Sequence, residues 1–503
     1  MKSVAQMNIV DIFAGPGGLG EGFSSVRSDD GCGSRRFKIV ASVEQGKHEC
    51  QTLRLRAFFR LLEDAKDTSS YFDYLKNPTA AMLEELILRH KDAWALADEE
   101  VIERTISSDS MDAIISEVKS RINPEEPLVL LGGPPCQAYS LVGRARNAEI
   151  IKANGEKWKS DVRRTLYKRY LDFVEMLRPD VFVMENVKGI LSASLPNGAS
   201  VFERVVSDLA HAGTGYSLYS LTTSGDISQL SPRDFVIRSE EYGIPQARHR
   251  VIILGVANRI AKIPRILRKR PDQIALEKII GDLPPLRSSF SLREKKLTNT
   301  ASEWRRFVTE VHKRYSMKEL EDLPHSTGGE WVSYTGKSQE LSHWLQPTTM
   351  DGVPNHQTRS HISEDIERYI YYALTTDAFS SSPKIHQLPI ELLPNHKNLI
   401  ALKNSKNSHT SEVVKFSDRF RVQRKSEPSR TITSHISKDG HYYIHYDSSQ
   451  ARSLTVREAA RIQTFPDNYR FEGPRTSQYH QAGNAVPPYL AYQIAEIVFE
   501  LIN

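Results

Sequence analysis

Two side chains that could take part in a reaction, a thiol and a carboxyl group, each follow a short, mainly apolar run. Cys136 comes after residues 128–131 and a Gly-Gly-Pro-Pro turn, and Glu185 comes directly after residues 180–184. Such runs are typical of strands buried on both faces of a parallel sheet, and ligands bind where these strands end. A thiolate can attack an electrophilic carbon, and a carboxyl group can move a proton. The pattern therefore predicts one cleft that holds a nucleophile and an acid–base group.

Both side chains have structural alternatives. Free cysteines are commonly small, inert core residues, but the glycines and prolines before Cys136 lift it out of the strand. A buried glutamate without a partner is costly, so Glu185 needs a ligand or a partner. We favour the reactive interpretation of both residues.

A glycine-rich turn near the start of the chain predicts a nucleotide-type site. The mainly apolar residues 8–13 run into a turn with Gly15, Gly17 and Gly20, and a helical pattern begins near Glu21. This order of strand, glycine turn and helix forms half of a doubly wound fold. The glycines match the spacing G-x-G-x-x-G and allow a ligand to approach the backbone closely.

Two acidic residues are placed to contact the same ligand. Glu44 ends a second apolar strand, at the position from which an acidic side chain binds ribose hydroxyls. Asp109 lies in a polar loop before a further helical pattern and could reach the cofactor. A surface carboxylate is the alternative for Glu44, and a helix cap is the alternative for Asp109.

Two pairs of arginines could meet an anion or a carbonyl oxygen. Arg248 and Arg250 lie two apart before an apolar strand, so in an extended chain both face the same way. Arg144 and Arg146 lie in a polar stretch after Cys136 that we interpret as a loop over the site, able to meet phosphates. Salt bridges rival the first assignment, and a solvated basic loop rivals the second.

Composition is typical of a cytoplasmic globular protein, and the order of strands, turns and helices predicts the α/β class with a doubly wound, mostly parallel sheet. The chain has 503 residues, of which 39% are apolar and 26% charged. Its apolar runs are too short to cross a bilayer, and no signal peptide precedes the first strand. The three cysteines lack C-x-x-C spacing, which argues against disulfides and a metal site. The net charge of +5 permits a polyanionic partner but does not demand one.

Three segments emerge along the chain. Residues 1–258 form the site-bearing domain, with a helical elaboration at about 47–117. Residues 259–453 are less regular and carry basic–aromatic pieces, which favours a separate domain that binds an anionic polymer. Residues 454–503 regain regularity, beginning with a capping box at Thr455 and ending in an apolar helix that should return to the first sheet.

The order of these motifs resembles that of bacterial DNA (cytosine-5-)methyltransferases. The Phe-Ala-Gly-Pro-Gly-Gly stretch at 13–18 is similar to the family's S-adenosylmethionine loop. Gly-Pro-Pro-Cys-Gln at 133–137 is similar to its nucleophile motif, and Glu-Asn-Val at 185–187 to its catalytic glutamate motif. Residues 246–250, 452–467 and 483–488 resemble its Gln-x-Arg-x-Arg motif, its bracing segment and its last cofactor motif.

The resemblance implies methyl transfer from S-adenosylmethionine to carbon 5 of a flipped-out cytosine in duplex DNA, through a covalent bond from Cys136 to carbon 6. It implies catalytic roles for Cys136, Glu185, Arg248 and Arg250. The cofactor contacts that it implies are Phe13, Ala14, Gly15, Gly17, Gly18, Leu19, Glu44, Asp109, Pro134, Leu166, Asn484, Ala485 and Val486. The implied DNA contacts are Gln137, Ser140, Arg144 and Arg146. We expect a monomer whose candidate partners are a cognate restriction nuclease or other phage-defence proteins.

The sequence departs from the family in places. Gln45 and Gly46 follow Glu44, where the family usually has a bulky apolar residue and then an acidic one. Asp109 lies in Ser-Asp-Ser, where Gly-Asp-Ile is usual, and the elaboration before Cys136 is longer than in compact members. These departures put the adenine contacts in doubt and leave the chemistry untouched.

Three other functions fit part of the pattern. A nicotinamide-dependent oxidoreductase would share the glycine turn and Glu44 but has no use for Cys136 beside Glu185. An RNA methyltransferase of the same family would have a smaller middle domain and a Cys-Phe-Thr tripeptide, which this chain lacks. A non-catalytic DNA-binding regulator would not need every chemical residue to be present.

Overall fold

The computed structural model describes residues 6–28, 33–135, 166–195, 198–293, 297–316, 320, 322–347, 350–395 and 419–503. Within these residues, eight strands form a central sheet in the order β3-β2-β1-β4-β5-β9-β6, with β7 also paired to β9. Strands β1 to β5 pair in parallel with one another, and β9 runs antiparallel to β5 and β6. The expected α/β class with a mostly parallel sheet is confirmed. The strands are β1 (Met7–Ile12), β2 (Phe37–Glu44), β3 (Val101–Glu103), β4 (Leu128–Gly132), β5 (Val181–Val187), β6 (Tyr216–Tyr219), β7 (Val236–Arg238) and β9 (His249–Ala257).

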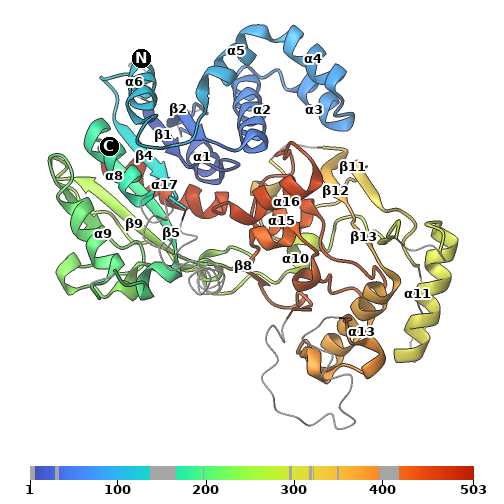
Figure 1. Ribbon diagram of the computed structural model, residues 1–503. Coiled ribbons are helices and arrows are strands. Elements are labelled where there is room, and N and C mark those ends of the chain that lie inside the picture. The colour runs from blue at the N-terminus through green and yellow to red at the C-terminus, as the bar shows by residue number, and fades with distance from the viewer. Residues whose placement is uncertain are drawn as a thin grey trace.

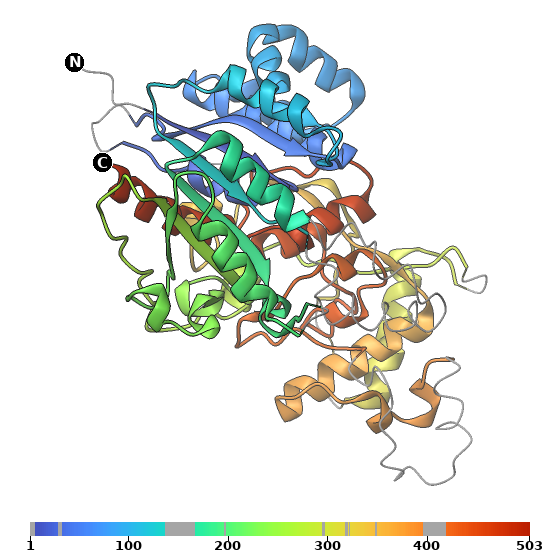
Figure 2. The same ribbon diagram turned by 60° about the vertical axis from the view of Figure 1, so that its left-hand side comes forward.

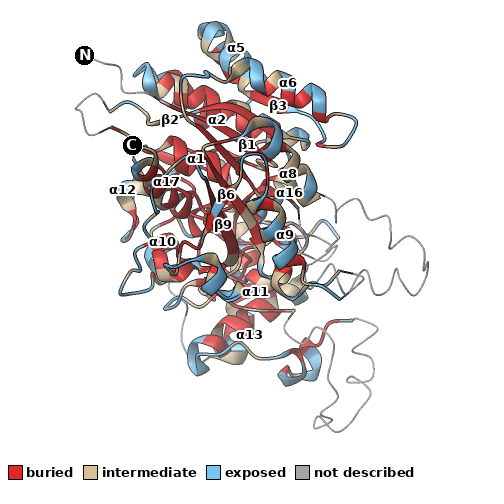
Figure 3. Ribbon diagram, turned by 90° about the vertical axis from the view of Figure 1, so that its left-hand side faces the viewer, coloured by how far each residue is buried: buried red, intermediate tan, exposed pale blue. Residues whose placement is uncertain are grey.

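Helices cover both faces of the sheet (Figures 2 and 3). Helices α6 (Met111–Arg121), α8 (Leu166–Leu177) and α9 (Val201–Ala210) cover one face. Helices α1 (Gly18–Ser24) and α17 (Pro488–Ile502) cover the other. Within α8, Tyr170, Phe173 and Val174 recur at helical spacing and are buried, which is why this segment forms a helix on an apolar surface. No helix in the described ranges is long and apolar enough to span a membrane.

The helical elaboration follows β2 and forms a small core of its own. It consists of α2 (Lys47–Asp64), α3 (Ser69–Lys76), α4 (Ala80–Arg89) and α5 (Lys91–Glu100), which arch over one end of the sheet in Figure 1. The expected helical stretch of about 47–117 is interrupted, because residues 101–103 form the edge strand β3 and α6 packs on the sheet. A three-residue edge strand leaves little periodic signal in a sequence.

We call residues 259–453 the second lobe. Helices α11 (Ala301–Tyr315) and α13 (Ser363–Phe379) pack together around Trp304, Val308 and Ile370. The lobe is therefore more regular than the sequence suggested. Its other elements are α10 (Glu277–Ile280), α12 (Ser342–Leu345), β10 (Ser289–Phe290), β11 (Gly328–Ser333), β12 (Gly352–Gln357), β13 (Ser360–His361) and β14 (Ser429–Arg430), which pairs with β8 (Gln246–Ala247).

Short 3-10 helices connect several of these elements. They are Lys188–Ser192, Ile227–Gln229, Pro232–Phe235, Ser239–Tyr242, Ile385–Gln387, Ile390–Leu392, Ser434–Ser437 and His441–Tyr443.

The last fifty residues return from the second lobe to the sheet. Helices α15 (Val456–Ile462) and α16 (Arg475–Asn484) lie between the sheet and the second lobe (Figure 1). They share one core with lobe residues such as Leu345 and Val353. The predicted capping box is confirmed, since the Thr455 hydroxyl accepts from the Glu458 amide and the Glu458 carboxylate accepts from the Thr455 amide. The expected return of α17 to the sheet is also confirmed.

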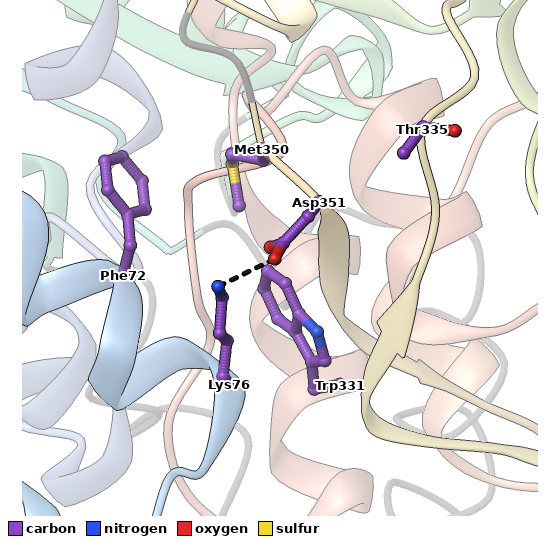
Figure 4. Close-up of a pocket in the computed structure, with 6 residues that line it drawn as sticks. All are labelled: Phe72, Lys76, Trp331, Thr335, Met350 and Asp351. Atoms are coloured by element: carbon purple, nitrogen blue, oxygen red, sulfur yellow. Dashed lines mark hydrogen bonds and ion pairs between the residues drawn. The ribbon is translucent and has the colours of Figure 1, made fainter.

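The elaboration also contacts the second lobe directly. Figure 4 shows Phe72 and Lys76 of α3 facing Trp331 and Asp351 of the β11–β12 region across a pocket. An ion pair of 2.7 Å joins Lys76 to Asp351. The elaboration therefore helps to hold the second lobe against the sheet-bearing part of the chain.

Candidate active site

The ends of β4 and β5 lie side by side at the carboxyl edge of the sheet. The two strands pair in parallel, with Gly132 opposite Met184. A side-chain carbon added at Gly133 would lie 3.1 Å from Oε2 of Glu185. The backbone that leads toward Cys136 therefore passes directly beside the Glu185 carboxylate. Cys136 itself lies outside the described residues, as do the four predicted DNA contacts Gln137, Ser140, Arg144 and Arg146.

Glu185 is paired with Arg250. The Nε atom of Arg250 lies 2.9 Å from Oε1 of Glu185, and the two side chains are only 17% and 12% exposed. The pair spans neighbouring strands, because Arg250 of β9 stands opposite Val187 of β5. The structure therefore presents a carboxylate and guanidinium N–H groups together at the edge of the sheet.

Arg248 has different partners from Arg250. Its Nη1 donates to the carbonyl oxygens of Ile432, at 2.7 Å, and Gly483, at 3.3 Å. Burial, together with the positive charge of Arg250, lowers the pKa of Arg248 to about 9. Arg248 thus ties the second lobe and the last motif to the sheet, whereas Arg250 faces the carboxylate. The catalytic role of Arg248 stays a prediction, because these contacts are with backbone carbonyls.

The glycine turn leaves open space above the end of β1. Phe13, Gly15 and Gly17 have positive φ angles of 54°, 57° and 84°, so the turn uses the left-handed region at three points. A side-chain carbon at Gly15 would meet no atom within 4 Å. Ala14, between Phe13 and Gly15, is half-buried. The turn can therefore receive a ligand against its backbone.

The Glu44 carboxylate braces this turn. It accepts hydrogen bonds from the amides of Gly15 at 2.9 Å, Gln45 at 2.8 Å and Gly46 at 2.9 Å. Burial raises the pKa of Glu44, although these amide donors act in the opposite direction. With four acceptor positions on a carboxylate, three protein donors leave room for one further donor from a ligand.

The last motif lies against the glycine turn. Gly18 packs so closely on the carbonyl of Val486 that any side-chain carbon there would overlap it. Ala485 and Val486 are buried, whereas Asn484 is exposed and its Nδ2 lies 3.3 Å from the His480 ring. Two stretches more than 460 residues apart thus meet at one place.

The remaining predicted cofactor residues differ in how far they are buried. The side chain of Leu19 packs in the apolar core, so only its backbone could meet a ligand. Asp109 is exposed in the turn before α6. Pro134 is buried just after β4, and Leu166 is half-buried at the start of α8.

Sequence reasoning missed one residue that touches this site. The hydroxyl of Tyr469 donates to the carbonyl of Pro16 inside the glycine turn. Tyr469 follows the Gln-Thr-Phe-Pro-Asp stretch at 463–467, but nothing in its spacing indicates a partner so far away in the chain.

Comparisons with known proteins identify the family of this chain. Residues 104–500 match the family described as C-5 cytosine-specific DNA methylase. Type II methyltransferase M.Bpa9945I of Bacillus paralicheniformis is 32% identical over 99% of this chain and 99% of its own. Type II methyltransferase M.AgeI of Thalassovita gelatinovora is 26% identical over 98% and 99%. A prophage-encoded E. coli protein assigned to the DNA modification methyltransferases shares the fold, with a TM-score of 0.50 at 18% identity over 99% and 100% of the two chains.

The chain belongs to the C-5 cytosine-specific DNA methylases. It is accordingly an enzyme, a DNA (cytosine-5-)methyltransferase of the bacterial type. The oxidoreductase and regulator alternatives are set aside by this membership.

Proposed function

We propose that the enzyme transfers a methyl group from S-adenosylmethionine to carbon 5 of a flipped-out cytosine in a specific duplex DNA sequence, through a covalent bond between Cys136 and carbon 6. One observation carries this proposal: the Glu185–Arg250 pair lies beside Gly133, three residues before Cys136. We propose that Cys136 acts beside this pair, so that a nucleophile, a proton donor and a guanidinium act on one pyrimidine ring.

The chemistry follows from the ring. Carbon 5 of cytosine is a poor nucleophile until the Cys136 thiolate adds at carbon 6 and breaks the aromaticity. Negative charge then builds toward N3, to which Glu185 in its acid form donates a proton, while Arg250 hydrogen-bonds O2. Carbon 5 becomes enamine-like and accepts the methyl group. A base, for which water suffices, removes the carbon-5 proton. The N3 proton returns to Glu185 as the thiolate leaves and the double bond re-forms.

Cys50 does not compete for this role. It is fully buried. Burial, and to a smaller extent the negative charge of Glu44, raises the pKa of its thiol to about 12. Since the thiolate is the nucleophilic form, Cys50 is inert at neutral pH. We therefore keep Cys136, which follows β4 in the sequence, as the proposed nucleophile.

The residues around the glycine turn fit S-adenosylmethionine. The open space over Gly15, the bracing carboxylate of Glu44 and the adjacent last motif support contacts with its nucleoside and amino-acid parts. When bound there, this cofactor supplies an electrophilic methyl group on a sulfonium sulfur. The cofactor contacts that we propose are Phe13, Ala14, Gly15, Gly17, Gly18, the Leu19 backbone, Glu44, Asp109, Pro134, Leu166, Asn484, Ala485 and Val486.

We assign target recognition to the second lobe, residues 259–453, and DNA contacts in the loop after Cys136 to Gln137, Ser140, Arg144 and Arg146. A base stacked in a duplex must swing out to reach the pocket. Binding of DNA should weaken as the salt concentration rises, because Lys and Arg side chains that neutralise phosphates release counterions.

The type II names of its relatives support a cognate restriction nuclease as partner. We propose that the enzyme acts as a monomer in the cytoplasm.

Bisulfite sequencing of DNA from cells that express this chain tests substrate and site together. Wild type should protect one sequence motif from conversion, and Cys136→Ala should protect none while still binding DNA in a gel-shift assay. Cys50→Ala is the matched control and should methylate normally. A duplex with 5-fluorocytosine at the target should trap an adduct on Cys136, because no carbon-5 proton can then be removed. Methylation by Cys136→Ala would refute the covalent route.

A further inference from the structure

We propose that Tyr469 is a positioning residue for the glycine turn and couples this turn to the second lobe. The inference rests on the proposed function, since it assumes that the turn holds S-adenosylmethionine. Tyr469 lies between the two parts of the molecule and touches neither the reacting atoms nor the space over Gly15.

The turn depends on support from outside itself. Gly15 and Gly17 flank Pro16 and both have positive φ, so this stretch has almost no side chains with which to pack. Glu44 holds one side of it through the Gly15 amide. Tyr469 holds the other side, since its hydroxyl donates to the Pro16 carbonyl and lies 3.2 Å from where a Gly17 side chain would begin.

The Tyr469 ring is itself held in place on several sides. The side chain is 1% exposed, and its ring lies 4.7 Å from the Phe465 ring. The guanidinium of Arg56 lies 4.8 Å above it. Arg56 in turn pairs with the buried Glu21 of α1. Burial raises the pKa of the Tyr469 hydroxyl, which therefore remains a donor at all ordinary pH values.

Arg457 connects Tyr469 to the second lobe. Its Nη2 donates to the Tyr469 carbonyl at 2.6 Å, and its Nε donates to the carbonyl of Pro354 in β12 at 2.9 Å. Arg457 is completely buried. One side chain thus spans from the β11–β12 hairpin to the residue that supports the turn.

Arg461 makes a second connection in the same segment. It binds Asp467 at 2.7 Å and Asp282 of the second lobe at 2.8 Å. Breaking a buried ion pair of this kind is costly, because it leaves an uncompensated charge. The segment that carries Tyr469 therefore moves with the second lobe rather than independently of it.

This arrangement has a thermodynamic consequence. If the second lobe changes its position or rigidity when DNA binds, Tyr469 transmits the change to the turn. Coupling between two binding sites is reciprocal, so DNA should change the affinity for the cofactor by the factor by which the cofactor changes the affinity for DNA.

Tyr469→Phe tests the positioning role, because it removes only the hydroxyl. Its matched control is Tyr216→Phe. The buried Tyr216 hydroxyl also donates to a proline carbonyl, that of Pro179, and Tyr216 lies in β6 at the far edge of the sheet. We expect calorimetry to show S-adenosylhomocysteine binding about three- to tenfold more weakly to Tyr469→Phe and unchanged to Tyr216→Phe. Equal affinity of Tyr469→Phe and wild type, or equal losses in both variants, would overturn the proposal. Failure of wild type to bind this ligand would instead overturn the proposed function.

The coupling has its own measurement. S-adenosylhomocysteine carries no methyl group, so its affinity can be measured with a target duplex present and no reaction. In wild type the duplex should change this affinity, and in Tyr469→Phe the change should shrink toward none. The same change in both proteins, or no change in wild type, would overturn the coupling.

Discussion

Arg250 and Glu185 face each other across antiparallel strands, with Nε and Oε1 2.9 Å apart. The pair is mostly shielded from water, so its attraction is stronger than that of a surface pair. The carboxylate therefore has a fixed orientation before any base arrives. Its second oxygen, Oε2, lies on the side of Gly133 and the chain toward Cys136.

Glu185→Gln should slow the chemical step by about a hundredfold or more, the usual range for loss of a positioned acid–base group. The amide keeps the shape of the side chain but cannot deliver a proton. Affinity for S-adenosylhomocysteine should stay within about twofold, because Glu185 lies away from the glycine turn. Single-turnover methylation and calorimetry give the two values, and parallel losses in both would show that Glu185 acts through structure alone.

Arg250→Lys and Arg248→Lys should fail in different ways. Arg250→Lys loses the Nε–H that pairs with Glu185, so single-turnover rates should fall while the thermal midpoint changes little. Arg248→Lys withdraws the donor from the buried carbonyls of Ile432 and Gly483. It should lower the free energy of unfolding by about 1–3 kcal/mol. The partner assignments would be refuted if Arg248→Lys lost activity at unchanged stability.

Gly18→Ala should damage the contact between the glycine turn and the last motif. The new methyl group would overlap the Val486 carbonyl, which is backbone and cannot rotate away. The free energy of unfolding should fall by about 1–3 kcal/mol, and S-adenosylhomocysteine should bind more weakly. Gly329→Ala in β11 is the control, since its nearest neighbour lies at 3.3 Å. Denaturant melts of both variants decide the matter, and equal losses would contradict this account.

Stability should fall as pH drops below about 6.5. Burial lowers the pKa of His356 and His445 to about 4 and that of His361 to about 3. Since each folded-state pKa lies below the unfolded value, their stabilisation is complete above pH 6.5 and is lost toward pH 4. Each such histidine should contribute about 2 kcal/mol to the loss between pH 7.5 and pH 5.

His356→Gln tests one of these contributions. Its amide can replace both contacts of the ring, with the Thr455 hydroxyl and the Pro284 carbonyl, without titrating. Chemical denaturation at pH 7.5 and pH 5 should show a smaller difference in His356→Gln than in wild type. The exposed His211→Gln should behave as wild type does, and an unchanged pH dependence in His356→Gln would count against the burial argument.

The parts that could be predicted from the sequence are those with local signals. Apolar runs ending at glycine, cysteine or glutamate predicted β1, β4 and β5, and the Thr455 capping box is purely local. The partners of charged side chains could not be predicted in this way. Arg248 and Arg250 are two residues apart and have similar neighbours in the sequence. Their partners differ because Arg248 lies between β8 and β9, where the carbonyls of residues 432 and 483 pack against it, whereas Arg250 lies in β9 beside Glu185.

The helices of the second lobe were missed in the sequence for a related reason. In α11, Trp304, Val308 and Val311 are buried at helical spacing, but a high density of charges dilutes this pattern. Tyr469 illustrates the other limit, since its partner Pro16 lies 453 residues away. Contacts of this kind depend on how the whole chain folds, which no window of neighbouring residues contains.

The close packing of α17 on α1 has a consequence for biosynthesis. Ile494 and Val498 of α17 cover the same apolar surface as Phe23 of α1. While the chain emerges from the ribosome, this part of the apolar face remains uncovered until residues 488–502 have been made. The strands made first therefore expose apolar surface until α17 packs on them, and exposed surface of this kind favours aggregation.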